Sequence, residues 1–261
     1  ESFGARLPED FLRHPVVLET MFVNGTEAWY APQRRWVAEN ATDDDLSTIA
    51  EDPFGRPHVR DEEWRTSHQM IHTLSHLLRY REKIGEDVLD LSPGRNLVVV
   101  EWGGGYGALA KLLWRRSLSY GRPVVLIEID LPFMCAVQEA YLDEVFGMGV
   151  MTRGILSSCE AWNLKESRPG VYFVPVGAAP FHMWGDVDLF VSTWALSEST
   201  AEAQEFVGVS TNWFQAKHLL LGYQTLRAPF APSTAFVGMF PESILVEKMP
   251  WGPPFQFYAF L

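Results

Sequence analysis

The sequence has few cysteines and no long apolar stretch. Its 261 residues include only two cysteines, Cys135 and Cys159, which is too few for a disulfide framework and gives no metal-binding spacing. A reducing cytoplasm is therefore the expected location. No stretch reaches the about 18 apolar residues that a membrane-spanning helix needs, so we expect no membrane partner.

Basic residues are also scarce. Lys and Arg number 21 against 33 Asp and Glu, which gives a formal net charge of −12. We expect no nucleic-acid partner, because phosphate backbones are held by clustered Lys and Arg. Hydrophobic residues make up 47% of the chain and include ten Trp and 17 Phe, which is enough for a large core and fits a small-molecule pocket walled by rings.

The pattern of apolar segments changes near residue 90. Residues 1–90 carry helix signals and no convincing strand, so we expect an N-terminal helical cap that shapes a substrate pocket. Residues 91–261 alternate short apolar strands with helices, which predicts an α/β domain with a mostly parallel seven-stranded sheet and helices on both faces. The expected strands, of which the last two form an antiparallel pair, span residues 97–100, 124–129, 171–174, 187–192, 218–223, 243–247 and 255–260.

A glycine-rich turn lies between the first expected strand and the helix that follows it. Residues 101–107 read EWGGGYG. Glycines have no Cβ, so the backbone can turn tightly and approach a ligand closely. Because ligands bind at the carboxyl ends of the strands in an open α/β sheet, the turn predicts a cofactor site.

The acid before the turn indicates which cofactor binds there. Gly103, Gly105 and Ala108 also satisfy the spacing of the dinucleotide-binding fingerprint. The carboxylate of Glu101 would repel a pyrophosphate, but it would attract the ammonium and sulfonium groups of S-adenosylmethionine. We therefore predict S-adenosylmethionine, ahead of a nicotinamide or flavin cofactor and ahead of a turn that binds no ligand.

Two acids lie at the end of the second expected strand. Strand alternation puts Glu128 and Asp130 on the same side, and either carboxylate could accept hydrogen bonds from ribose hydroxyls. We favour Asp130 because it is nearer the strand end. The alternative is that this acid caps a helix that begins at Pro132.

The segment 101–110, EWGGGYGALA, resembles the first motif of class I S-adenosylmethionine-dependent methyltransferases. More narrowly, residues 50–225 resemble the sugar O-methyltransferase family. This narrower resemblance is carried by IDLP at 129–132 with Gln138 and Tyr141, DLFVST at 188–193 with Glu198, and EDPFGRP at 51–57 with Ser67 and His76. The chain departs from the family at Trp194, where a polar or acidic residue is usual, and at Pro175, where the acid that often binds the adenine amino group is missing.

The resemblance implies a Rossmann-like class I methyltransferase fold with S-adenosylmethionine as the methyl donor. It also implies a small-molecule acceptor, a hydroxyl group of a sugar or glycosylated small molecule in natural-product or polysaccharide biosynthesis. Together with the turn and the strand ends, it gives the expected cofactor-binding residues as Glu101, Gly103, Gly105, Tyr106, Gly107, Asp130, Leu131 and Thr193.

Methyl transfer to an alcohol requires alignment of the acceptor oxygen and benefits from a base. Glu198 follows the fourth expected strand, and His68, His72 and His76 recur every four residues, which puts them on one helix face. The candidate catalytic residues are Glu198, His72 and His68. The alternatives are an acid at a helix N-terminus for Glu198 and a plain polar helix face for the histidines. We expect no metal site, because no cluster of carboxylates stands out.

Two other functions stay open at this point. The acceptor could instead be an amine, a carboxylate or a phenol of a non-sugar small molecule. The chain could also be a non-catalytic protein with the same fold, whose cap serves as an interaction module. A homodimer is compatible with either function.

Overall fold

The computed structural model describes residues 7–21, 26–156, 164, 167–182, 184–225 and 233–261, and Cys159 lies outside them. The α-helices are α1 (Pro15–Thr20), α2 (Glu27–Asn40), α3 (Asp43–Ser47), α4 (His68–Ile84), α5 (Ala108–Tyr120), α6 (Pro132–Phe146), α7 (Ala201–Glu205) and α8 (Ser233–Val237). The strands are β1 (Leu97–Trp102), β2 (Val124–Asp130), β3 (Thr152–Ile155), β4 (Gly170–Pro175), β5 (Leu189–Thr193), β6 (His218–Gln224), β7 (Leu245–Lys248) and β8 (Gln256–Phe260). Single turns of 3₁₀ or π helix are η1 (Phe11–Arg13), η2 (Val88–Asp90), η4 (Ala179–Phe181), η5 (Phe206–Ser210) and η6 (Trp213–Gln215).

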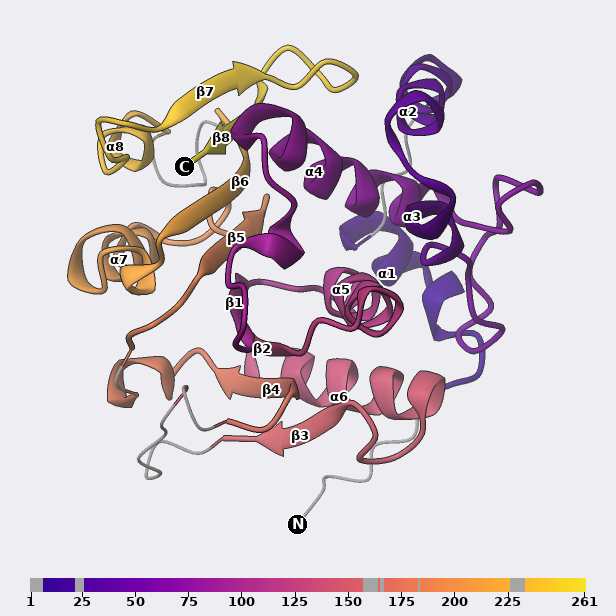
Figure 1. Cartoon of the computed structure of the whole chain (residues 1–261), viewed down its shortest axis with the longest axis horizontal. Helices are drawn as coiled ribbons and strands as arrows, with labels where there is room; N and C mark the ends of the chain where they lie inside the picture. Colours follow the sequence, from indigo (N-terminus) through magenta and orange to yellow (C-terminus); the bar gives the residue numbers. More distant parts are fainter. Residues whose placement is uncertain (1–6, 22–25, 157–163, 165–166, 183, 226–232) are drawn as a thin grey trace.

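The eight strands form one sheet in the order β3-β4-β2-β1-β5-β6-β8-β7 (Figure 1). The strands from β3 to β6 in this order are parallel, and β8 and β7 close the sheet as an antiparallel pair. The prediction of a mostly parallel sheet is confirmed, but the prediction of seven strands is wrong. The additional strand, β3, has only four residues, of which Thr152 is buried and the other three, including Gly154, are half-buried, so it lacks the apolar run that marks the other strands.

Helices cover both faces of the sheet, as predicted. Alternate residues of β1 face opposite sides, so that Leu97 and Val99 share one buried cluster with residues of α4, α5 and α6. On the other face, Val98 and Val100 share a second cluster with residues of η5, η6 and α8. The continuous apolar runs of the central strands are therefore explained by burial on both sides.

The apolar residues between Asp61 and about Lys83 recur at helical spacing and predict one helix over this segment, but α4 begins only at His68. Asp61 pairs with Thr66 in an isolated bridge, and its Oδ1 accepts a hydrogen bond from the Trp64 backbone N–H at 2.9 Å. These contacts hold the preceding residues in a turn, and the helix starts only after Ser67, whose Oγ accepts a hydrogen bond from the Met70 N–H at 3.2 Å. The helix ends at Ile84, and the C-cap residue Gly85 that follows adopts a φ of +84°.

The N-terminal residues are helical and share a core with the sheet. Leu12, Val37 and Leu74 belong to the same buried cluster as Val99 and Leu220 of the sheet. The residues on the two sides of position 90 therefore do not form separate cores, and the division into a 1–90 cap and a 91–261 methyltransferase domain stays a prediction. In the part of the chain that the structure describes, every helix is too short or too polar to cross a membrane.

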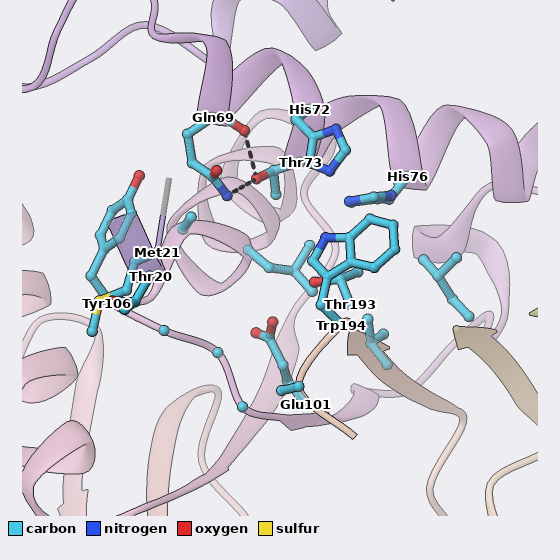
Figure 2. A pocket seen from close by; sticks show the side chains of 18 of the residues that line it. Thr20, Met21, Gln69, His72, Thr73, His76, Glu101, Tyr106, Thr193 and Trp194 are labelled. Atoms are coloured by element: carbon cyan, nitrogen blue, oxygen red, sulfur yellow. Dashed lines mark hydrogen bonds between the residues drawn. The ribbon is translucent and has the colours of Figure 1, made fainter. Parts of the chain in front are cut away.

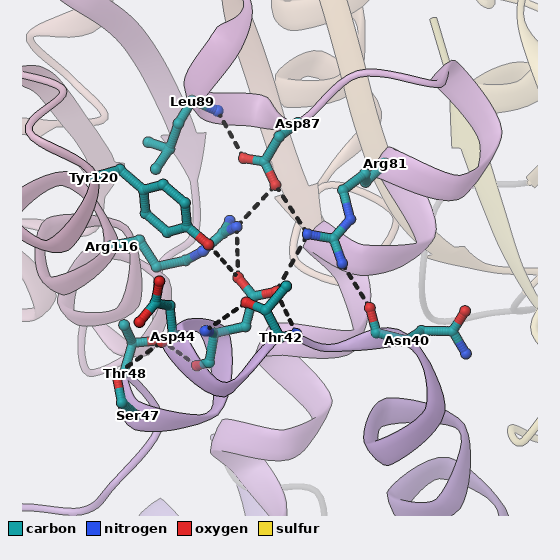
Figure 3. A network of polar contacts seen from close by, with 11 residues as sticks. Asn40, Thr42, Asp44, Ser47, Thr48, Arg81, Asp87, Leu89, Arg116 and Tyr120 are labelled. Carbon is teal, nitrogen blue, oxygen red and sulfur yellow. Dashed lines mark hydrogen bonds and ion pairs between the residues drawn. The ribbon is translucent and has the colours of Figure 1, made fainter.

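A buried ionic network joins α3 and α4 to α5 (Figure 3). The guanidinium of Arg116 on α5 is fully buried, and its Nη2 lies 2.8 Å from Asp45 Oδ1 and 2.8 Å from Asp87 Oδ2. Burial alone would raise the pKa of Asp45, but the charge of Arg116 and the hydrogen bond from the Thr42 backbone N–H lower it below its usual value. The network fixes the N-terminal helices to α5, the helix that follows the glycine-rich turn.

Candidate functional site

The site lies where the strand order reverses. From β1 the chain proceeds to β2 and β4 on one side and then returns to β5 on the other. In a doubly wound sheet, such a switch point leaves a crevice at the carboxyl ends of the two strands. Here these ends carry the glycine-rich turn, residues 103–107 after β1, and the loop that begins at Trp194 after β5.

Glycine is required in the turn for conformational and steric reasons. Gly103, Gly105 and Gly107 have φ angles of +77°, +60° and +95°, a region that L-residues with a side chain rarely adopt. A Cβ at Gly103 would also lie only 2.1 Å from the Cβ of Ala195. The turn after β1 and the loop after β5 therefore meet at this position.

A cavity of about 180 Å³ opens between the turn, the loop and α4 (Figure 2). The predicted residues that line it are Glu101, Gly103, Gly105, Tyr106, Thr193, His72 and Glu198. The predicted residues that do not line it are Gly107, Asp130, Leu131 and His68. Gly107 is the N-cap of α5, and Leu131 is the exposed N-cap of α6.

Two buried carboxyl groups lie beneath the turn. Glu101 and Glu128 are neighbours in the register of β1 and β2, and they are only 4% and 0% exposed. A Cβ at Gly104 would lie 2.1 Å from Glu128 Oε2 and 3.2 Å from Glu101 Oε2, so both side chains converge under this glycine. Burial raises the pKa of Glu101 to about 7, and Asp130 adds to the increase.

The carboxylate oxygens of this pair are short of donors. An ionised carboxylate can only accept hydrogen bonds. If both groups are ionised, Glu101 Oε2 and both carboxyl oxygens of Glu128 are buried without a hydrogen-bond donor among the described residues. Glu101 lines the cavity (Figure 2). Its carboxylate can therefore accept hydrogen bonds from a cationic ligand there.

Asp130 fastens α6 to the glycine-rich turn. Its Oδ1 accepts a hydrogen bond from the Leu131 N–H at 2.8 Å, and its Oδ2 accepts one from Gln138 Nε2 at 2.9 Å. Gln138 Nε2 also donates to the carbonyl of Gly105 at 2.9 Å. Burial raises the pKa of Asp130 to about 6. The carboxylate keeps lone pairs for further donors, since two oxygens offer about four acceptor positions.

Helix α4 forms the opposite wall of the cavity, where two histidines meet the indole of Trp194 (Figure 2). The Trp194 ring is nearly parallel to that of His72, with centroids 6.0 Å apart and planes at 12°, and it meets His76 edge-on at 6.3 Å. Trp194 has a φ of +76°, which is strained for a residue with a large side chain. Its backbone N–H donates to the carbonyl of Gly222 at 2.7 Å, and this bond helps to hold the conformation.

Hydrogen bonds define the state of His72. Ser75 Oγ donates to the carbonyl of His72, so it can accept from Gln33 Nε2 at 2.8 Å. The same Gln33 nitrogen lies 2.8 Å from His72 Nδ1, which must then act as an acceptor. The hydrogen of the neutral ring is thereby assigned to Nε2, which has no partner in the described part of the chain.

Both cavity histidines are uncharged at neutral pH. Burial, reinforced by His76 and His68, holds the pKa of His72 well below its usual value, and burial lowers that of His76 to about 3. His76 Nδ1 lies 2.9 Å from the hydroxyl of Tyr258. His68 lies one helical turn from the cavity. Its Nε2 lies 2.9 Å from Gln33 Oε1, and its ring meets that of His72 edge-on with centroids 6.5 Å apart.

Glu198 lies on the side of the cavity formed by the loop after β5. Its carboxylate accepts a hydrogen bond from Gln224 Nε2. The residue as a whole is exposed, but surrounding protein atoms partly desolvate the carboxyl group and raise its pKa. A carboxylate with a raised pKa beside a cavity is suited to take up a proton.

Sequence reasoning missed several lining residues. Gln69 and Thr73 lie beside His72 and His76 because positions separated by three, four and seven residues share one helix face, so the spacing of the histidines already contained the signal. Thr20 and Met21 also line the cavity, and no local signal in their segment indicates this. Among the described residues, no group of three or more His, Cys, Asp or Glu side chains could hold a metal ion.

No family model matches the sequence, and no curated protein matches it significantly. The fold is similar to solved structures of methyltransferases. The citrinin polyketide synthase CMeT domain has 12% identity and a TM-score of 0.47 over 94% of this chain and 67% of that one. The DszA carbon methyltransferase has 11% identity and a TM-score of 0.45 over 73% of this chain and 52% of that one.

A third similar structure is the SAH-bound methyltransferase PaMTH1 from Podospora anserina. It has 12% identity and a TM-score of 0.44 over 92% of this chain and 97% of that one. This chain thus spans 97% of PaMTH1, about two thirds of the CMeT domain and about half of DszA. At these identities the likeness concerns the fold alone.

Proposed function

We propose that this chain is an S-adenosylmethionine-dependent methyltransferase. The observation that carries the proposal is the Glu101 carboxyl group, which is only 4% exposed, lines the cavity and forms no ion pair with the described residues. A buried carboxylate beside a cavity favours a cationic ligand. A pyrophosphate group at the same turn would be repelled.

The residues around the turn fit this donor. Glu101 would accept hydrogen bonds from the ammonium group, and the bare backbone of Gly103 and Gly105 would allow close approach. Asp130, with its remaining lone pairs, would accept from ribose hydroxyls. Tyr106 and Thr193 line the same cavity, and Leu131 follows Asp130 at the start of α6. When bound, S-adenosylmethionine supplies an electrophilic methyl group on a sulfonium.

The preferred acceptor is an uncharged molecule that offers a hydroxyl group, and we favour a sugar or glycosylated small molecule. The described residues that line the cavity include no Lys or Arg, and His72 and His76 are neutral. A carboxylate acceptor would therefore lack a counter-charge. The indole of Trp194 offers a flat surface for a sugar ring, and it would serve a phenol equally well. Methyl transfer to a sugar or glycosylated small molecule would belong to a pathway of natural-product or polysaccharide biosynthesis.

We propose different roles for the two predicted catalytic residues that line the cavity. His72 presents a hydrogen at Nε2, so it would donate a hydrogen bond to the acceptor oxygen and hold it in line with the methyl group. Glu198 is then the preferred base for the hydroxyl proton, since its carboxylate can accept one. His68, which does not line the cavity, would act on His72 through Gln33 and through the contact between the two rings.

Calorimetry and a methyl-transfer screen test the function. The full chain should bind S-adenosylmethionine and its demethylated product, and it should not bind NAD or FAD. Transfer of a labelled methyl group should be strongest with glycosides in a panel that also contains phenols, amines and carboxylates. Binding of NAD or FAD in place of S-adenosylmethionine would refute the proposal. Donor binding without transfer to any acceptor would favour the non-catalytic alternative.

A further inference from the structure

The register of β1 and β2 leaves two carboxyl groups facing each other in a buried space. Glu101 and Glu128 are directly paired in the register. Both are more than nine-tenths buried, and both converge under Gly104. Glu128 is completely enclosed and does not line the cavity, whereas Glu101 does. The two residues of the pair therefore have different access to a ligand.

Two ionised carboxylates in this arrangement would be unstable. Ionised carboxylates are acceptors only, and the described residues give neither group an ion-pair partner. The groups that face the pair do not supply a positive charge either. Asp130 follows Glu128 on the same side of β2, Cys135 faces it from α6, and His72 and His76 on the far wall are neutral. A hydrogen between the two carboxyl groups satisfies both.

We propose that Glu128 is a positioning residue of the donor site, a neutral carboxylic acid that donates a hydrogen bond to Glu101 and aims the charged Glu101 carboxylate at the cavity. The inference rests on the proposed function for its ligand, but the protonation state belongs to the ligand-free protein. Glu128 receives the proton because it is completely enclosed, whereas Glu101 borders the cavity and can be solvated there. In agreement, burial and the neighbouring Glu101 raise the pKa of Glu128 well above its usual value.

Gly104 is part of the same arrangement. Any side chain at this position would occupy the space of the Glu128 carboxyl group, since a Cβ would lie 2.1 Å from Oε2. The middle glycine of the turn is therefore explained by the acid beneath it. Gly104 does not have a positive φ, so its backbone conformation alone does not require glycine. The Glu128 carboxyl group beside it supplies the steric reason.

Substitutions at Glu128 test whether this residue acts as a neutral hydrogen-bond donor or as a second anion. Glu128→Gln keeps a neutral hydrogen-bond donor, so its affinity for S-adenosylmethionine should stay within about twofold of the unmodified protein. Glu128→Leu removes the donor but replaces it with an apolar side chain that suits the buried position. Its affinity at pH 7 should fall about tenfold or more, as expected for a lost hydrogen bond to a charged group. Without that bond, the pH at which binding is half-maximal should also rise.

The matched control is Glu205→Gln, which makes the same chemical change at an exposed position of α7. It should leave both affinity and pH profile unchanged. If Glu128→Gln weakens binding as strongly as Glu101→Gln does, then Glu128 acts as a second anion and the inference is wrong. Unaltered affinity and pH profile in Glu128→Leu would equally overturn it.

A measurement without ligand distinguishes failure of this inference from failure of the proposed function. Infrared difference spectra of the ligand-free protein at pH 7 should contain a protonated-carboxyl band that Glu128→Gln removes and Glu205→Gln retains. If the band is present but S-adenosylmethionine does not bind, the proposed function fails and the proton assignment stands. If the donor binds but no such band depends on Glu128, the assignment fails and the proposed function stands.

Discussion

Replacing Glu101 by Gln should stabilise the ligand-free protein while it abolishes tight binding of the methyl donor. The side chain is only 4% exposed, and burial raises its pKa from 4.5 to about 7. When the pKa of a carboxyl group is higher in the folded than in the unfolded protein, folding is most favourable at a pH below the unfolded pKa, where the group is protonated in both states. That stability is lost as the pH rises from about 4.5 to about 7.

The size of the effect follows from the difference between the two pKa values. At 1.36 kcal/mol for each tenfold change in proton affinity, it corresponds to about 3 kcal/mol. Glutamine is neutral at every pH, so Glu101→Gln should escape this loss. At pH 8 the variant should therefore unfold with a free energy about 3 kcal/mol higher than the unmodified protein, and at pH 4 the two should differ by less than about 1 kcal/mol.

Urea denaturation at several pH values, with and without S-adenosylmethionine, measures both halves of this prediction. A ligand at 100 times its dissociation constant adds about 2.7 kcal/mol to the stability of a protein that binds it. The unmodified protein should show this gain, and Glu101→Gln should not. Glu205→Gln serves as the exposed control. A Glu101→Gln variant that is less stable at pH 8, or whose advantage does not change with pH, would refute the reasoning.

Three further substitutions test other parts of the structure. Gly103→Ala should abolish donor binding in calorimetry, because its Cβ would lie 2.1 Å from that of Ala195 at a φ of +77°; normal affinity would contradict the proposed turn. Asp45→Asn should lower the unfolding free energy by about 3–5 kcal/mol in urea titrations, because it leaves the buried charge of Arg116 with less compensation; a loss below about 1 kcal/mol would contradict this role. The stability due to ionised Asp45 should be retained above pH 4 and lost as the pH falls through its lowered pKa. Trp194→Gly should raise the acceptor KM without changing donor affinity. The variant should stay folded, because glycine relieves the strain of the left-handed conformation and so offsets the stability lost with the packing of the indole. An unchanged KM for every acceptor would exclude the ring from the acceptor site.

Local patterns in the sequence were sufficient for the glycine-rich turn and for most of the sheet. The turn was visible because Glu101 and the glycines are neighbours in the chain, and the central strands were visible because burial on both faces makes them continuously apolar. β3 was missed because an edge strand with half-buried residues does not need such a run. The start of α4 was misplaced because Asp61 pairs with Thr66 instead of entering the helix.

The parts of the site that sequence reasoning could not give depend on contacts between distant residues. Glu128 was considered only for ribose, because its relation to Glu101 is set by the register of two strands. The state of His72 depends on Gln33, which lies 39 positions away in the chain. Asp130 was identified from its place at a strand end, but its link through Gln138 to the turn became evident only from the packing of α6.

Helix α4 places His72 and His76 in the cavity, while Leu74 and Leu77 of the same helix lie in the core that reaches the sheet. Exchanging residues 1–90 for the corresponding part of another protein would therefore uncover the sheet as well as alter the cavity. Attempts to redirect the proposed methyl transfer to new acceptors should instead vary only the cavity-facing positions 69, 72, 73 and 76, and leave the leucines of the core face as they are.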